Sequence, residues 1–113
     1  MSLRQNLESM LAAGQDNALL RFTLGNEYLK EGLAGTAVEH YSAAIEHDPA
    51  YTAAWKQLGK ALEQNDEPGK ALEAWLRGQK AAEKSGDVQA GKEMGVFARR
   101  LEKNLGDNPG KGD

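Results

Sequence analysis

The sequence predicts an all-α protein, and three observations carry this assignment. Alanine, leucine, glutamate, lysine and glutamine are abundant, and these residues favour helices. Apolar residues recur at steps of three and four along almost the whole chain, which is the spacing of one helix face. No segment alternates β-branched and polar residues over the length that a strand requires.

The first half of the chain predicts three helices, over residues 2–13, 17–31 and 34–47. Ser2 and Asp16 are the expected N-caps, and Gly14 and Gly32 are expected to end the first two helices. The third helix should stop at Asp48, because the residue before a proline avoids the helical region. The apolar stripes are Leu3, Leu7, Met10 and Leu11; Leu20, Leu24 and Tyr28; and Ala37, Val38, Tyr41, Ala44 and Ile45.

The second half predicts helices over residues 51–64, 68–84 and 88–104. Pro68 suits a first helical turn, and Asp87 is the expected cap of the last helix. Residues 107–113 contain nothing to bury and are expected to form a disordered tail. The stripes are Trp55, Leu58, Ala61 and Leu62; Ala71, Leu72, Trp75 and Leu76; and Met94, Phe97, Ala98, Leu101 and Leu105.

An internal repeat of 34 residues organises the middle of the chain. Sliding the sequence by that length aligns 18–51 with 52–85, and the identical positions include small residues at places where two helices would approach closely. Gly25 aligns with Gly59, and each costs about 1 kcal/mol inside a helix relative to alanine. We expect the large residues Tyr41 and Trp75 to fill the space that these small neighbours leave.

These motifs resemble the tetratricopeptide repeat (TPR) family, whose unit is a 34-residue pair of antiparallel helices. The family pattern is matched by Leu24, Gly25, Tyr28, Ala37, Tyr41, Ala44 and Pro49, and again by Trp55, Leu58, Gly59, Leu62, Ala71, Trp75 and Gly78. Arg21 and Glu83 depart from it. The resemblance implies repeats at 18–51 and 52–85, flanked by capping helices at 1–17 and 86–106, the second of which has Lys92 and Glu93 where leucine and glycine are expected.

The same resemblance implies a concave groove, lined by the first helix of each pair, that receives a peptide or a partner helix. The expected lining residues are Leu19, Phe22, Asn26, Leu29, Lys30, Ala53, Lys56, Lys60, Glu63, Met94 and Phe97. Lysines opposite an apolar patch suit a segment that carries a carboxylate and apolar anchors. The alternative is that the apolar members are core and the lysines are an ordinary solvated surface.

Composition argues against several other classes of function. The chain has no cysteine, and His40 and His47 lie two helical turns apart, too far for one metal ion. We therefore expect neither catalytic residues nor a metal or cofactor. A net charge of −3 with interspersed signs gives no support for nucleic-acid binding, and no apolar run reaches the length of a membrane span.

The sequence thus predicts a cytoplasmic scaffold or adaptor that binds a protein partner of unknown identity as a monomer. The alternative is a homo-oligomer, a structural module that stacks on further copies through its terminal helices.

Overall fold

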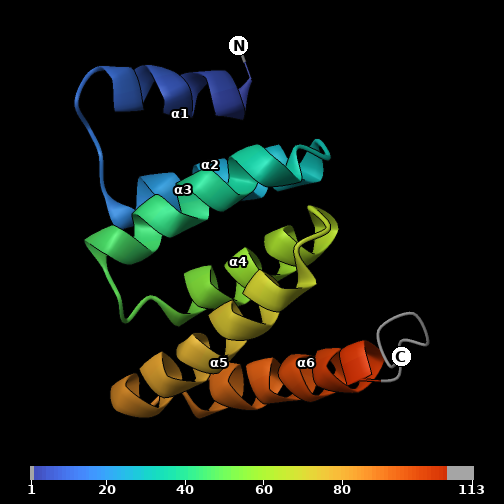
Figure 1. Cartoon of the computed structure of the whole chain (residues 1–113). Helices are drawn as coiled ribbons and strands as arrows, with labels where there is room; N and C mark the ends of the chain where they lie inside the picture. Colours follow the sequence, from blue (N-terminus) through green and yellow to red (C-terminus); the bar gives the residue numbers. More distant parts are fainter. Residues whose placement is uncertain (1, 107–113) are drawn as a thin grey trace.

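The computed structural model describes residues 2–106, which form six helices (Figure 1). Their bounds are α1 (Leu3–Ala12), α2 (Ala18–Lys30), α3 (Ala34–His47), α4 (Thr52–Gln64), α5 (Pro68–Ser85) and α6 (Val88–Gly106). Every predicted helix is present with ends within two residues of the expected ones, and residues 2–106 contain no strand. The all-α prediction is confirmed. The predicted disordered tail lies outside the described residues.

Local sequence signals set several of the helix starts. The Ser2 hydroxyl accepts a hydrogen bond from the Gln5 amide, and the Gln5 side chain accepts one from the Ser2 amide, so α1 begins with a capping box. Asp87 accepts from the Ala90 amide and caps α6 as expected. The cap of α2 was predicted wrongly: the Asn17 side chain, not Asp16, accepts from the Leu20 amide.

The helices pack in chain order into a curved stack, with α1 at one end and α6 at the other (Figure 1). The closest associations are the pairs α2–α3 and α4–α5. The first helices of successive pairs also approach each other, α2 with α4 and α4 with α6, whereas no Cα atoms of α3 and α5 lie within 8 Å of one another. Because α2, α4 and α6 approach more closely than the helices behind them, their side of the stack is the concave one.

Glycine–aromatic contacts hold each helix pair together, as the repeat predicts. A Cβ atom at Gly25 would lie 2.5 Å from Cε1 of Tyr41, and one at Gly59 would overlap the indole of Trp75. Tyr41 is fully buried and Trp75 only 2% exposed. The missing glycine side chains therefore allow the two helices of each pair to approach at the short end of the usual interaxial range.

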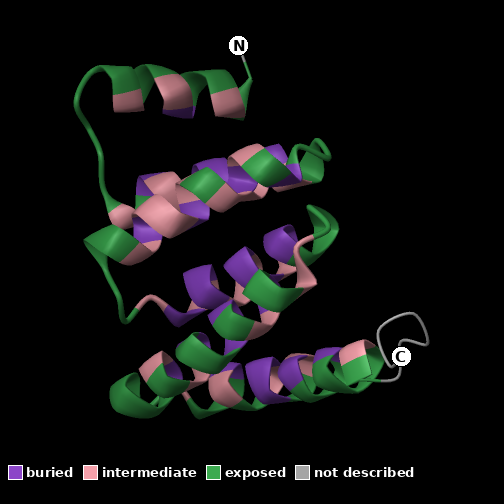
Figure 2. Ribbon diagram, viewed as in Figure 1, coloured by how far each residue is buried: buried purple, intermediate pink, exposed green. Residues whose placement is uncertain are grey.

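Buried residues occur on each of the six helices (Figure 2), and they form one continuous core. Trp55 and Trp75 both belong to it, and their indole nitrogens donate to the backbone oxygens of Pro49 and Lys56. Leu76 was expected in the apolar stripe of α5 but is 42% exposed, because it faces away from α4 and α6.

The turn before α2 carries an ion cluster that the sequence did not reveal. Asp16, instead of capping α2, accepts two hydrogen bonds from the Arg21 guanidinium at 2.8 and 3.0 Å. Nε2 of His47 at the end of α3 lies 3.0 Å from the same carboxylate. The hydrogen bond from Arg21, supported by that of His47, lowers the pKa of Asp16 to about 2. The cluster ties the α1–α2 turn to the first helix pair.

Replacing Asp16 with asparagine should lower the free energy of unfolding at neutral pH by up to about 1 kcal/mol, the range of exposed ion pairs. A carboxylate with a depressed pKa stabilises the fold above its unfolded value of 3.8, and that contribution is lost as the pH falls towards 2. Urea unfolding across this range should therefore show the two proteins converging. Equal stability of both proteins at pH 7 would contradict the role of Asp16.

Candidate functional site

The concave side of the stack is hollowed between α2 and α4 and between α4 and α6, and we call the surface formed by these three helices the first-helix face. The larger hollow, the α2–α4 depression, has a volume of about 620 Å³. It is lined by Phe22, Asn26, Glu27, Leu29, Lys30, Ala53, Lys56 and Gln57. The smaller, the α4–α6 depression, has a volume of about 280 Å³ and is lined by Lys60, Glu63, Gln64, Trp75, Phe97 and Arg100.

The structure brings most of the predicted groove residues onto this face. Those in the α2–α4 depression are Phe22, Asn26, Leu29, Lys30, Ala53 and Lys56, and those in the α4–α6 depression are Lys60, Glu63 and Phe97. Leu19 lines neither depression and is 66% exposed. Met94 was placed wrongly: it is fully buried against Gly78 of α5, because it lies on the side of α6 that packs on the preceding pair.

Aromatic packing supports the floor of the α2–α4 depression. The Phe22 ring lies 4.9 Å from that of Tyr51 and 5.8 Å from that of Tyr41, measured between centroids. The Tyr41 hydroxyl donates to Oδ1 of Asn26 at 2.5 Å. Burial raises the pKa of Tyr41 to about 12, so the phenol stays protonated and holds the Asn26 amide in place. The floor is preformed, as ligand sites usually are.

The lysines of this face are engaged in different ways. Lys56 makes an ion pair with Glu93 of α6 at 3.0 Å, and this contact lowers the pKa of Glu93. Nζ of Lys60 lies 5.2 Å above the Phe97 ring, within the range of a cation–π contact. Lys30 is paired with Glu27 at 2.9 Å, yet its side chain remains 71% exposed. Lys30 is therefore the most exposed of the three lysines that line the two depressions.

The two histidines, which the sequence places too far apart to share a metal ion, each have a polar partner in the structure. His40 is half-buried on α3, where its ring stacks on Tyr28 at 5.3 Å and its Nδ1 lies 3.1 Å from an Arg21 nitrogen. Burial lowers the pKa of His40. Within residues 2–106, no three His, Asp or Glu side chains lie close enough together to hold a metal ion.

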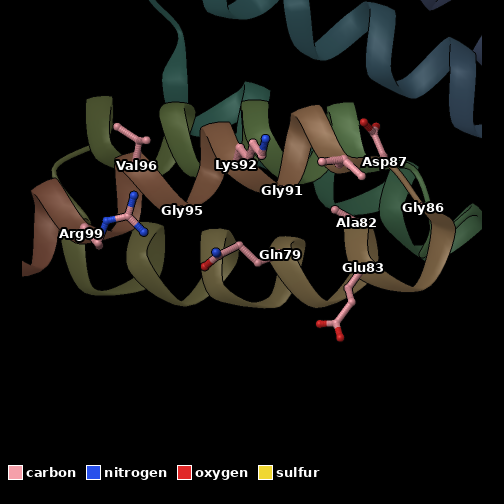
Figure 3. Close-up of a pocket in the computed structure, with 11 residues that line it drawn as sticks. Gln79, Ala82, Glu83, Gly86, Asp87, Gly91, Lys92, Gly95, Val96 and Arg99 are labelled. Atoms are coloured by element: carbon pink, nitrogen blue, oxygen red, sulfur yellow. The ribbon is translucent and has the colours of Figure 1, made fainter.

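A third depression, which we call the terminal groove, lies between α5 and α6 and has a volume of about 650 Å³ (Figure 3). Residues from both helices line it: Gln79, Ala82, Glu83, Gly86, Asp87, Val88, Gly91, Lys92, Gly95, Val96 and Arg99. Gly91 and Gly95 pack closely on α5: a Cβ atom at Gly91 would lie 3.4 Å from Cβ of Ala82, and one at Gly95 would lie 2.8 Å from Nε2 of Gln79. The hollow lies beside this contact, where no described helix covers α6.

The register of α6 also corrects the sequence analysis. The starts of α2, α4 and α6 are separated by 34 and then 36 residues, because α5 is longer than α3. With that shift, Met94 and Gly95 take the places of Leu58 and Gly59, and all four are buried. A strict 34-residue period had placed Lys92 and Glu93 there.

Antiparallel helix pairs stacked around a shared core define this chain as a helical repeat protein. It is 50% identical over 99 residues to the TPR repeat-containing protein PA0015 of Pseudomonas aeruginosa, an alignment that covers 88% of this chain and 94% of that protein. The chain belongs to the tetratricopeptide repeat family. No protein-family model matches it.

Two solved structures contain a similar stack of helices. The solution structure of protein BPP2914 from Bordetella parapertussis has a TM-score of 0.82 at 42% identity, and the match covers 96% of this chain and 94% of that one. The tetratricopeptide repeat domain protein from Salinibacter ruber has a TM-score of 0.71 at 26% identity, and the match covers 76% and 87%. The fold is thus of the kind that serves as a protein–protein interaction module. Among the described helices, none is both long enough and apolar enough to span a bilayer.

Proposed function

We propose that the chain is a non-catalytic adaptor whose first-helix face binds a short segment of a partner protein. The observation that carries this proposal is the preformed α2–α4 depression. Its floor is made by Phe22 and Leu29, and Asn26 and Gln57 supply amides at its wall. Lys30 supplies an exposed positive charge at the rim. A peptide with one or two apolar anchors and a carboxylate near them matches this arrangement.

The chemistry of the face also supports a binding role over a catalytic one. Its cations Lys56 and Lys60 are held by Glu93 and by the Phe97 ring, so they orient neighbouring side chains. Titratable groups poised for acid–base work are the usual mark of an active site. Here Tyr41, which is buried beneath this face, has a pKa raised to about 12 and stays protonated, donating its hydroxyl hydrogen to Asn26. A cytoplasmic location and a scaffold role remain predictions.

The proposal is tested with peptides selected from a random display library against the full chain. Replacing Lys30 with glutamate should weaken their binding at least tenfold, about 1.4 kcal/mol, because the rim charge is reversed. Nuclear magnetic resonance titration should place the shifted amides on α2 and α4.

Lys70→Glu is the matched control. Lys70 is 73% exposed and paired with Glu67 three residues earlier, just as Lys30 is 71% exposed and paired with Glu27. Each reversal therefore creates the same local acidic pair, but Lys70 lies at the start of α5, away from both depressions of the face. Peptides that bind the two variants equally well would show that the α2–α4 depression is not the binding surface.

A further inference from the structure

The two ends of the stack are complementary halves of a repeat. At one end, α6 has the burial pattern of a first helix, with Met94 and Gly95 in the places of Leu58 and Gly59, but no second helix follows it within the described residues. At the other end, α1 precedes α2 and packs on it as α3 precedes and packs on α4. It therefore holds the place of a second helix, and no described first helix precedes it.

The terminal groove is the place that a second helix would occupy beside α6. Tyr41 covers Gly25 and Trp75 covers Gly59, each from the second helix of its own pair. At Gly95, the nearest side chain is that of Gln79, which comes from the preceding pair. Gly91 stands where α4 has the bulky Trp55. The result is an uncovered hollow along α6, lined by Gly91 and Gly95 (Figure 3).

Each of these two ends carries two exposed apolar side chains. Of the seven large hydrophobic residues exposed within residues 2–106, Leu3 and Met10 lie on α1 and Val88 and Val96 lie on α6; the other three are Leu19, Leu33 and Leu76. Leu3 and Met10 are seven residues apart, so they share one side of α1, and they are 51% and 40% exposed. Val88 and Val96, which are 66% and 42% exposed, line the terminal groove.

The N-terminal and C-terminal segments of the stack have net charges of opposite sign. Residues 2–50 carry seven acidic and three basic side chains, whereas residues 68–106 carry eight basic and five acidic ones. The lining of the terminal groove itself is balanced, with Lys92 and Arg99 against Glu83 and Asp87, so the charge difference lies between the two segments as a whole. Such an arrangement favours a head-to-tail encounter between copies and disfavours the contact of like ends.

We infer that α1 of a second copy docks in the terminal groove, so that α6 of one chain and α1 of the next form a helix pair. Leu3 and Met10 of the incoming helix would then lie over the hollow at Gly91 and Gly95, beside Val96. This contact joins two different surfaces, so it builds short linear assemblies that grow with concentration. It uses neither depression of the first-helix face and is independent of the peptide-binding proposal.

The experiment uses two full-length variants with glutamine at exposed positions, which keeps helix propensity high. The head variant is Leu3→Gln/Met10→Gln, and the tail variant is Val88→Gln/Val96→Gln. Because all four side chains are exposed, both variants should retain the helical circular dichroism of the parent. Sedimentation velocity should show concentration-dependent association of the parent, weakened by high salt, and monomers for each variant alone.

Mixing the two variants is the decisive step. The mixture contains one intact tail and one intact head, so it should form a heterodimer and nothing larger. A parent protein that stays monomeric at every concentration would overturn the inference. So would a head variant that still dimerises, which indicates tail-to-tail contact, or a mixture that remains monomeric.

Discussion

Replacing Gly59 with alanine should destabilise the protein by roughly 2–3 kcal/mol, within the range of overpacking in a well-packed core. The added Cβ would overlap the indole of Trp75, which is held in place by its hydrogen bond to the Lys56 carbonyl at 3.1 Å. The indole cannot move without breaking that bond or separating α4 from α5. Chemical unfolding monitored by circular dichroism measures the loss as a shift of the midpoint.

Gly69→Ala is the control for this experiment. Gly69 lies in the first turn of α5, and no atom lies within 4 Å of the position that its Cβ would take. Alanine should therefore be neutral or stabilising by about 0.5–1 kcal/mol, the ordinary gain at a helical site. If both substitutions had the same effect, the glycine–aromatic contact would not be what sets the spacing of the helix pair.

The fold could be predicted from the sequence because its main signals are local and repeated. Apolar spacing fixed six helices, and the pairing of Gly25 with Tyr41 and of Gly59 with Trp75 followed from the 34-residue repeat. The prediction failed where the period changed. Because α5 is longer than α3, α6 begins two residues later than the 34-residue period predicts. The composition of residues 80–90 gives no signal of that shift.

For the candidate site, the sequence predicts which residues lie near one another but not which interactions their side chains make. Residue spacing places Phe22 and Asn26 on one side of α2, but it does not say how the lysines are engaged. The Lys56–Glu93 ion pair joins α4 to α6 across 37 residues, and its register depends on the shifted phase of α6. Asp16 was likewise assigned as a cap from its position before a helix, whereas its carboxylate is bound by Arg21 and His47.

Replacing Met94 with alanine should cost about 2–5 kcal/mol, the range for truncating a buried methionine. The Met94 side chain is fully buried and reaches the backbone of α5 at Gly78, where the absence of a side chain makes room for its sulfur. Truncation leaves a cavity beside Gly78, which has no side chain that could fill it. Thermal and chemical unfolding of Met94→Ala measure the loss.

Val96→Ala is the comparison on the same helix, since Val96 is 42% exposed and should change stability by less than about 1 kcal/mol. A residue that lined an open groove would behave like Val96, and truncating it would affect ligand binding more than stability. A small loss of stability for Met94→Ala would thus contradict the burial of Met94 against α5 and support its original assignment to the groove. A large loss means that α6 is fastened to α5 by the same kind of small–large contact that joins the helices of each pair.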